Sequence, residues 1–367
     1  MKFNFPKKSE LIFFDVVDEI ILKIFKNDKK LIINLRTLKK NLNFFILLKI
    51  LLSFQLIKIL IKDGFLVAYV CSYIKYSNAK KVITCIDNNT RFYMLKHYFR
   101  NIKFISIQNG SRHKFMDIFG SPDLKKALQC DEILVFGNSI KKKYMEHIKA
   151  SVKTVGCFRS NNFNIFKLKK KNTILFISQF RSFSEDKIMN HFGKDVTTWG
   201  KMNLNLNELL PNILNYCGKN NLQFGILSTT GSKNEFEYFR KILGLKTYWK
   251  FHRPKNRRDS YKLLDMSEII VNVWSTMGLE SLSRGNKTCF FRQKDFGYND
   301  RHFGWPKKYI GTNFFCSNNY DYLSVSRILS QMRLVNLNDW KKLVNKYTKD
   351  NLIYNFQNKK LINLVKE

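Results

Sequence analysis

Acidic residues are scarce in this 367-residue chain, which has 28 Asp and Glu against 65 Lys and Arg and a formal net charge of +37. An excess of this sign favours anionic partners: nucleic acid, an anionic membrane surface or phosphate-bearing substrates. The densest basic runs, Lys141–Lys143 and Lys167–Lys171, are nevertheless short. Because no concentrated basic stretch with interleaved aromatic residues is evident, nucleic-acid binding is the less favoured interpretation. We favour compositional drift, since Lys, Asn, Ile and Phe are abundant throughout the chain, together with modest attraction to a membrane surface.

Paired cysteines are missing as well. The seven cysteines form no CxxC motif and no Cys/His cluster with zinc-ligand spacing, which argues against a zinc site. The chain also has no Asp-x-Asp motif, so we expect no metal requirement and no cofactor. Cys71, Cys85, Cys130 and Cys289 lie in or beside apolar runs. This pattern predicts buried free thiols in a reducing cytoplasm.

A clean apolar run of the length that spans a bilayer, about 20 residues, is not found. The nearest approach is Leu42–Ile61, which Lys49, Ser53, Gln55 and Lys58 interrupt. It predicts a core helix, and an interfacial amphipathic helix is the alternative. The N-terminus has charges inside its apolar stretch and no small-residue cleavage site, so we do not expect a signal peptide.

What the chain does contain is a regular alternation of strand and helix patterns. The first set of expected strands covers residues 31–35, 65–71, 82–86, 103–107, 132–136 and 152–155. The helices between them are expected at residues 37–61, 89–99 and 139–148. The second set has expected strands at residues 173–178, 223–228, 247–251, 269–273 and 288–291. Its helices are expected at residues 206–217, 233–243 and 260–266, from residue 276, and in a tail from residue 320.

This alternation predicts an α/β fold with parallel, helix-covered sheets. The length exceeds that of one typical core, so two domains are expected. We predict two Rossmann-like, doubly wound domains that face a central cleft. Residues 1–160 would form an acceptor domain, residues 161–335 a donor domain and residues 336–367 a helical tail.

The most informative segment is Val271–Phe291, which has the pattern strand, small-residue turn, short helix, glycine and strand. Ser275 and Thr276 are helix-capping residues, and a helix start presents free backbone N–H groups. Such a start at the carboxyl edge of a parallel sheet is where phosphates bind. Ser275, Thr276, Met277 and Gly278 are therefore candidate phosphate ligands, and an ordinary βαβ unit without a ligand is the alternative.

Other polar residues follow predicted strands of the second domain. A role in holding a donor is one interpretation of these side chains, since arginine neutralises diphosphates and Glu280 shares a helix face with Thr276. Structural capping, or pairing of Glu280 with Arg284, is the other. The candidate donor-binding residues are Ser178, Gln179, Arg181, His252, Arg253 and Glu280. The aromatic run Phe303–Pro306 could stack on a base or sugar, or pack as a surface loop.

Polar residues also follow predicted strands of the first domain. Asp87 follows a buried strand, where a carboxylate can act as a base or as a helix N-cap. The run from Gln108 to His113 follows the next strand and supplies a flexible glycine, a cation and a proton carrier. The candidate catalytic residues are Asp87 and His113. The candidate acceptor-side residues are Gln108, Asn109, Gly110, Arg112 and Arg159.

In this order the motifs resemble a bacterial family of surface-carbohydrate biosynthesis proteins, which look like glycosyltransferases of the two-Rossmann (GT-B) type. The segments that carry the resemblance lie between Ile86 and Pro306 and are IDNNTRF, ISIQNGSRHKF, DEILVFGNSIKKKY, VGCFRSN, ILFISQFR, SEIIVNVWSTMGLESLSRGNKTCFF and FGWP. A more distant similarity is to CDP-glycerol glycerophosphotransferases. Those proteins have a histidine before the glycine where this chain has Asn109, so His113 is the nearest substitute. The related surface-carbohydrate proteins often have Asp where this chain has Trp274.

The resemblance implies a metal-independent glycosyltransferase that uses a nucleotide-activated sugar and a glycan or lipid-linked acceptor. Its expected location is cytoplasmic, with peripheral attachment to the inner face of the membrane. Transfer of a polyol phosphate is the first alternative, and a basic nucleic-acid-binding protein is the second. The sequence names neither the sugar nor the nucleotide.

Overall fold

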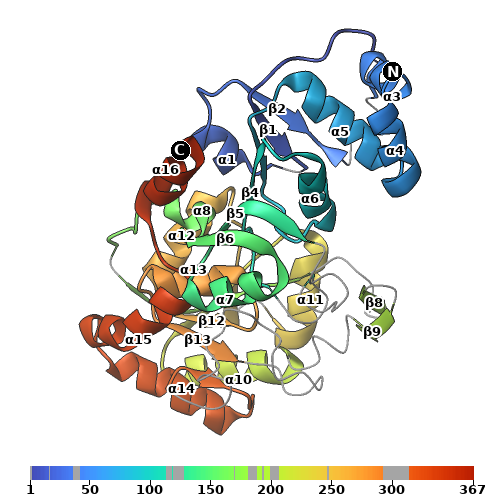
Figure 1. The fold of residues 1–367 in the computed structure, drawn as a ribbon. Coiled ribbons are helices and arrows are strands. Elements are labelled where there is room, and N and C mark those ends of the chain that lie inside the picture. Colours follow the sequence, from blue (N-terminus) through green and yellow to red (C-terminus); the bar gives the residue numbers. More distant parts are fainter. Residues whose placement is uncertain are drawn as a thin grey trace.

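Two six-stranded parallel sheets organise the molecule (Figure 1). The computed structural model describes residues 2–15, 17–35, 42–112, 118, 128–168, 170–180, 188–191, 194–198, 206–245, 248–291 and 314–367. Within this part of the chain, every strand pair of the two large sheets is parallel. The predicted α/β class with two doubly wound sheets is confirmed.

The first sheet has the strand order β2-β1-β3-β4-β5-β6. Its strands are β1 (Leu11–Phe14), β2 (Lys30–Ile33), β3 (Lys81–Thr84), β4 (Lys103–Ile107), β5 (Gln129–Val135) and β6 (Lys149–Thr154). Its helices are α1 (Glu19–Ile24), α3 (Phe44–Leu51), α4 (Phe54–Asp63), α5 (Phe65–Ser77), α6 (Thr90–Leu95), α7 (Asn138–His147) and α8 (Phe158–Asn161).

The second sheet has the order β11-β10-β7-β12-β13-β14. Its strands are β7 (Lys171–Ile177), β10 (Gln223–Leu227), β11 (Trp249–His252), β12 (Ser267–Asn272), β13 (Thr288–Phe291) and β14 (Cys316–Ser317). A separate hairpin has strands β8 (Ile188–His191) and β9 (Lys194–Thr198). The helices are α10 (Leu206–Lys219), α11 (Lys233–Leu243), α12 (Arg257–Met266), α13 (Thr276–Ser283), α14 (Tyr322–Leu334), α15 (Leu337–Asn351) and α16 (Lys359–Lys366).

The C-terminal tail is helical, as expected, but it does not stay beside the second sheet. Helix α15 packs against α7. Leu361 and Val365 of α16 are buried in the core beside Phe13 and Ile105 of the first sheet. Figure 1 shows α16 next to α1 and α8. The chain therefore crosses back to the first sheet, and the proposed boundaries at residues 160 and 335 stay a prediction.

Two of the expected elements are wrong. Residues 65–71 are not a strand, because they form the start of helix α5, in which Val67–Cys71 are all buried. An apolar run that is buried on every side has no periodicity that separates strand from helix. The expected helix 37–61 is broken instead at Leu52–Ser53 into α3 and α4, which are bent by 97°. Residues 36–41 lie outside the described part.

All seven cysteines are free and buried, which confirms the expectation for Cys71, Cys85, Cys130 and Cys289. Burial raises the pKa of the Cys71 and Cys85 thiols to about 12. These thiols are therefore packing groups and not nucleophiles, since the thiolate is the reactive form.

Candidate functional site

Asp87 lies just beyond the carboxyl end of β3 and is fully buried. Its carboxylate accepts hydrogen bonds from the Asn109 backbone N–H at 3.0 Å and from Arg112 Nε at 2.6 Å. Arg112 Nη2 and the Tyr144 hydroxyl donate to it as well. Both oxygens are thus occupied by donors of the protein. This geometry suits an anchor for the loop after β4 better than the predicted general base.

The loop after β4 is fixed from two sides. The buried Gln108 accepts from the Phe136 backbone N–H at 2.9 Å and donates to the Gly110 carbonyl at 2.8 Å. Arg159 donates to the Asn109 carbonyl. The structure therefore brings together the five residues predicted for the acceptor side. His113, the other candidate base, lies outside the described residues.

Two acidic residues at this edge were not predicted. Asp18 forms ion pairs with Arg159 at 2.9 Å and with Arg257 of α12 at 3.4 Å. Burial alone would raise the pKa of Asp18, but hydrogen bonds from Arg159 and the Ile20 N–H lower it below its usual value. Asp15, with a left-handed φ of 72°, accepts from Asn89 Nδ2 at 2.8 Å. The signal that could have revealed both is their position directly after the apolar run Leu11–Phe14, as Asp87 follows β3.

Helix α13 begins where the sequence predicts it. The Ser275 side chain caps the helix and accepts from the Met277 backbone N–H at 3.3 Å. The buried Asn272 side chain holds the preceding turn by accepting from the Ser275 N–H at 3.0 Å. A Cβ on Gly278 would lie 2.2 Å from this Asn272 side chain. Glycine is therefore needed for the helix start to approach the end of β12.

Glu280 is buried on the same helix. Its carboxylate accepts hydrogen bonds from the Tyr261 hydroxyl at 2.6 Å and the Cys157 thiol at 3.0 Å. Burial and the neighbouring Glu280 raise the pKa of the Cys157 thiol well above its usual value, so the thiol keeps the proton that it donates. The alternative that Glu280 pairs with Arg284 is wrong, because Arg284 forms a buried ion pair with Asp265 at 2.5 Å. The predicted role of Glu280 in binding a sugar or ribose hydroxyl stays a prediction. A ligand hydroxyl would compete there with the Tyr261 hydroxyl and the Cys157 thiol.

Ser178, at the end of β7, is hydrogen-bonded to a second buried carboxylate, that of Glu235. Its hydroxyl donates to Glu235 at 2.5 Å. Glu235 also accepts from the Ser228 hydroxyl at 2.7 Å and from the backbone N–H groups of residues 229–231 at 2.8 to 3.0 Å. Burial alone would raise the pKa of Glu235, but these hydrogen bonds lower it. The sequence analysis missed Glu235, although Ser232 and Glu235 have the spacing of a capping box.

The structure does not bring the remaining donor-side candidates together in one site. Gln179 is half-buried, and its Oε1 has no hydrogen-bond partner among the described residues. The His252 ring lies against Gly225 of β10, and burial lowers its pKa, with a smaller contribution from Lys250. The exposed Arg253 stacks instead on the rings of Phe236 and Phe251. The predicted His-Arg pair therefore does not point to one place. Arg181 and Phe303–Pro306 lie outside the described residues.

The carboxyl edges of the two sheets meet. The Ser111 backbone N–H donates to Thr276 Oγ1 at 2.9 Å, and the Thr276 hydroxyl lies 3.2 Å from Ser111 Oγ. The Cys157–Glu280 hydrogen bond and the Asp18–Arg257 ion pair cross between the same edges. The start of α13 therefore faces the polar loop after β4, as the two-domain prediction requires.

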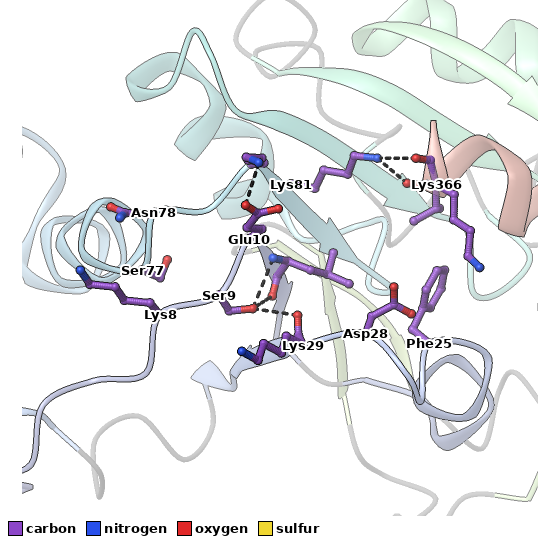
Figure 2. A pocket seen from close by; sticks show the side chains of 13 residues that line it. Lys8, Ser9, Glu10, Phe25, Asp28, Lys29, Ser77, Asn78, Lys81 and Lys366 are labelled. Carbon is purple, nitrogen blue, oxygen red and sulfur yellow. Dashed lines mark hydrogen bonds and ion pairs between the residues drawn. The ribbon is translucent and has the colours of Figure 1, made fainter.

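One cavity of about 830 Å³ lies elsewhere, at the amino end of β1 and β3 (Figure 2). Lys80 forms an ion pair there with Glu10 at 2.7 Å, and Lys81 donates to the Val365 carbonyl at 2.7 Å. The Lys81 contact ties α16 to the first sheet, at the sheet edge opposite the candidate site. Across the described ranges, no group of three or more His, Cys, Asp or Glu side chains has the arrangement of a metal site.

Comparisons with known proteins agree with this geometry. A family model described as "putative O-antigen biosynthesis protein" matches residues 105–367. No curated protein matches the chain.

Among solved structures, a glycosyltransferase from Rickettsia africae is 14% identical, with a TM-score of 0.51 and 98% of each chain covered. A UDP-GlcNAc 2-epimerase from Neisseria meningitidis bound to UDP-GlcNAc is 11% identical, with a TM-score of 0.52 and 97% of this chain and 99% of that chain covered. The wall teichoic acid polymerase TagF is 9% identical, with a TM-score of 0.54 and 98% and 89% covered.

At these identities the solved structures establish the fold, which is of the GT-B type. The family match covers most of the chain and establishes its family. The chain belongs to this family of O-antigen biosynthesis proteins.

Proposed function

We propose that this chain is a glycosyltransferase that moves a sugar from a nucleotide-activated donor to a surface-polysaccharide or lipid-linked acceptor. The observation that carries the proposal is the meeting of the capped start of α13 with the polar loop after β4. The family supports a role in polysaccharide synthesis. A protein of the same fold binds UDP-GlcNAc, which supports a nucleotide sugar as the donor.

The donor diphosphate would bind at the start of α13. Ser275, Thr276 and the backbone N–H groups of Met277 and Gly278 are the ligands that we propose there. The positive end of the helix dipole and the N–H groups both stabilise an anion. In the present arrangement the Met277 N–H bonds to Ser275 Oγ and the Thr276 hydroxyl contacts Ser111. Donor binding would therefore replace the cap at the start of α13 and the Thr276–Ser111 contact between the two edges.

The reaction would proceed by attack of an acceptor hydroxyl on the anomeric carbon of the sugar. The new glycosidic bond forms as the bond between that carbon and the diphosphate breaks, and the nucleoside diphosphate leaves. Positive groups near the diphosphate would stabilise the leaving charge without a metal. The hydroxyl proton would pass to a base on the acceptor side. We keep His113 as the candidate base, because both oxygens of Asp87 are held by other groups.

Donor binding to substituted proteins tests this assignment. Thr276→Val removes the hydroxyl at the start of α13 and keeps the shape of the side chain, and we expect affinity for the preferred nucleoside diphosphate to fall about tenfold, one charge-assisted hydrogen bond. Ser283→Ala, at the other end of the same helix, is the matched control and should bind like the wild type. Calorimetry against UDP, CDP, GDP, dTDP and CMP first identifies the nucleotide. Unchanged affinity in Thr276→Val would contradict the assignment.

Transfer of a polyol phosphate is a second candidate, supported by the similar fold of TagF. The products separate the two reactions. A glycosyltransferase forms a glycosidic bond and releases a nucleoside diphosphate, whereas a polyol-phosphate transferase forms a phosphodiester and releases a nucleoside monophosphate. Mass spectrometry of the released nucleotide therefore decides between them.

A further inference from the structure

We propose that helices α3 and α4, with the N-terminal segment 2–8, form a docking surface for an anionic lipid bilayer. We call this region the α3–α4 face. Figure 1 shows both helices at the end of the molecule farthest from α14 and α15, with the N-terminus beside α3. The inference does not depend on the proposed reaction.

Large apolar side chains on the described surface concentrate on this face. Of 19 exposed large hydrophobic residues, nine lie in the segment 2–8, in α3 and α4 and the bend between them, and at the start of α5. Leu51, Leu52, Phe54 and Ile61 are 68, 78, 72 and 80% exposed. A monomeric soluble protein rarely exposes a contiguous apolar patch, and such a patch marks a site of interaction.

The patch is continuous across the segment and the helices. Residue Lys2 pairs with Asn43 in a short parallel bridge. The rings of Phe3 and Phe44 lie 5.6 Å apart, and those of Phe5 and Phe45 stack at 4.0 Å. The N-terminal segment therefore extends the apolar surface of α3.

The two helices lie on the protein with one face inward. Ile46 and Ile50 of α3 and Leu56 and Ile59 of α4 are buried, and both helices pack against α5. No single described helix is long and apolar enough to cross a membrane, and α3 and α4 pass that test only as a pair bent by 97°. With one apolar stripe in the core and another outward, the pair has the arrangement of helices that lie in the membrane interface.

The charges around the apolar surface identify the partner as an anionic bilayer. Residues 2–8 and 42–78 contain seven lysines and one acidic residue, Asp63. Lys58 is exposed and lies over the Phe54 ring at 4.4 Å, so a cation and an apolar ring are presented together. Lysine beside exposed aromatic and aliphatic groups suits a layer of anionic headgroups over acyl chains.

Co-sedimentation of the full chain with vesicles tests the proposal. The probes are neutral vesicles of phosphatidylcholine alone and anionic vesicles of phosphatidylcholine with about 30% phosphatidylglycerol. The wild type should bind the anionic vesicles, and the triple variant Leu51→Ser, Leu52→Ser, Phe54→Ser should bind at least about tenfold more weakly. The control is Leu323→Ser with Leu334→Ser, which changes side chains of α14 that are 80 and 88% exposed and should bind like the wild type. Lys58→Gln with Lys62→Gln should weaken binding to the anionic vesicles and leave the small binding to neutral vesicles unchanged.

Several outcomes would overturn the proposal. These are no binding of the wild type to anionic vesicles, equal binding of the wild type and the triple variant, or an equal loss in the α14 control. Sedimentation velocity of the same proteins tests a second copy of the chain as the occupant. A wild-type dimer that the triple variant abolishes, without vesicle binding, would assign the face to self-association. Circular dichroism confirms that each variant is folded, and vesicle binding needs no donor, so failure of the proposed reaction would not affect the result.

Discussion

Two buried carboxylates, Asp87 and Glu235, lie at the carboxyl edges of the two sheets and are stabilised in different ways. Both are 0% exposed. Asp87 has a cationic partner, Arg112, whose own side chain is only 7% exposed. Among the described residues, the hydrogen-bond donors to Glu235 are all neutral, three hydroxyls and three backbone N–H groups. One edge therefore depends on charge pairing, and the other on preorganised dipoles.

The two kinds of stabilisation give the two edges different sensitivity to substitution. At the first edge the loop after β4 is held by side chains that carry full charges, so removal of one breaks a buried ion pair. At the second edge the loop 229–231 wraps around Glu235 through its own backbone. That loop keeps its shape without a cation. The first edge is accordingly the more sensitive of the two to a single substitution.

Asp87→Asn should have the largest effect on stability. The substitution removes the carboxylate that pairs with the buried Arg112 and places an amide opposite its donors. Breaking a buried pair of this kind costs about 3–5 kcal/mol of the free energy of unfolding. Urea denaturation at neutral pH measures it. Glu10→Gln is the control, since the Lys80–Glu10 pair is exposed on both sides and should change stability by less than about 1 kcal/mol.

If Asp87→Asn costs no more than the exposed control, the contrast between the two edges is wrong. Should the protein fail to fold, Arg112→Lys provides a second measurement. Lysine keeps the positive charge but loses the paired donation by Nε and Nη2. Its cost should fall between those of Asp87→Asn and Glu10→Gln.

Glu235→Gln should have a smaller effect, about 1–3 kcal/mol, because the amide oxygen still accepts some of the hydrogen bonds and no buried cation is left unpaired. The pH dependence sharpens the test. Since hydrogen bonding lowers the pKa of Glu235 in the folded state, its contribution is present above the unfolded pKa, about 4.3. It is lost as the pH falls through the folded pKa.

The stability difference between the wild type and Glu235→Gln should therefore narrow as the pH falls below about 4.3. Urea denaturation at pH 7, 5 and 3.5 measures the difference between the two proteins, which removes the effect of every other titrating group. A difference that widens on acidification would mean that the pKa of Glu235 is raised and not lowered. Ser232→Ala removes the α11 cap and an acceptor for the Thr230 hydroxyl but no hydrogen bond to the Glu235 carboxylate, so it is the control with no expected narrowing.

The start of α13 at the second edge was easier to predict than the partners of the two buried carboxylates. Ser275 and Gly278 stand in a strand–turn–helix pattern whose local chemistry specifies the turn, and α11 and β13 begin and end where the sequence predicts. Capping and glycine preferences act over a few residues and are visible in the sequence. Placement of the candidate phosphate site needed only such local signals.

The features that the sequence did not predict depend on contacts between distant residues. The run Phe65–Cys71 reads as a strand or a helix, and only burial against α3 and α4 decides for the helix. The return of α16 to the first sheet joins residues far apart in the sequence, such as Lys81 and Val365, which are 284 positions apart. The partners of Asp87 likewise come from the loop after β4 and from α7, and Ser178 reaches Glu235 from the end of β7. Periodicity gives no information on such pairings.

The ion pair between Asp18 and Arg257 tests whether charge itself, or burial of charge, makes the first edge sensitive. Arg257 is 47% exposed and lies 3.4 Å from Asp18, whereas Arg159 is 19% exposed and bonds to the same carboxylate at 2.9 Å. Arg257→Gln should therefore cost less than about 1 kcal/mol, and the cost should vanish in 0.5 M salt, where the Debye length is a few ångström. Arg159→Gln should cost more, about 1.5–3 kcal/mol, because a charged hydrogen bond to a shielded carboxylate is lost. Urea denaturation at two salt concentrations measures both. Equal costs for the two substitutions would mean that charge at this edge acts independently of burial, and the distinction drawn between Asp87 and Glu235 would then lose its physical basis.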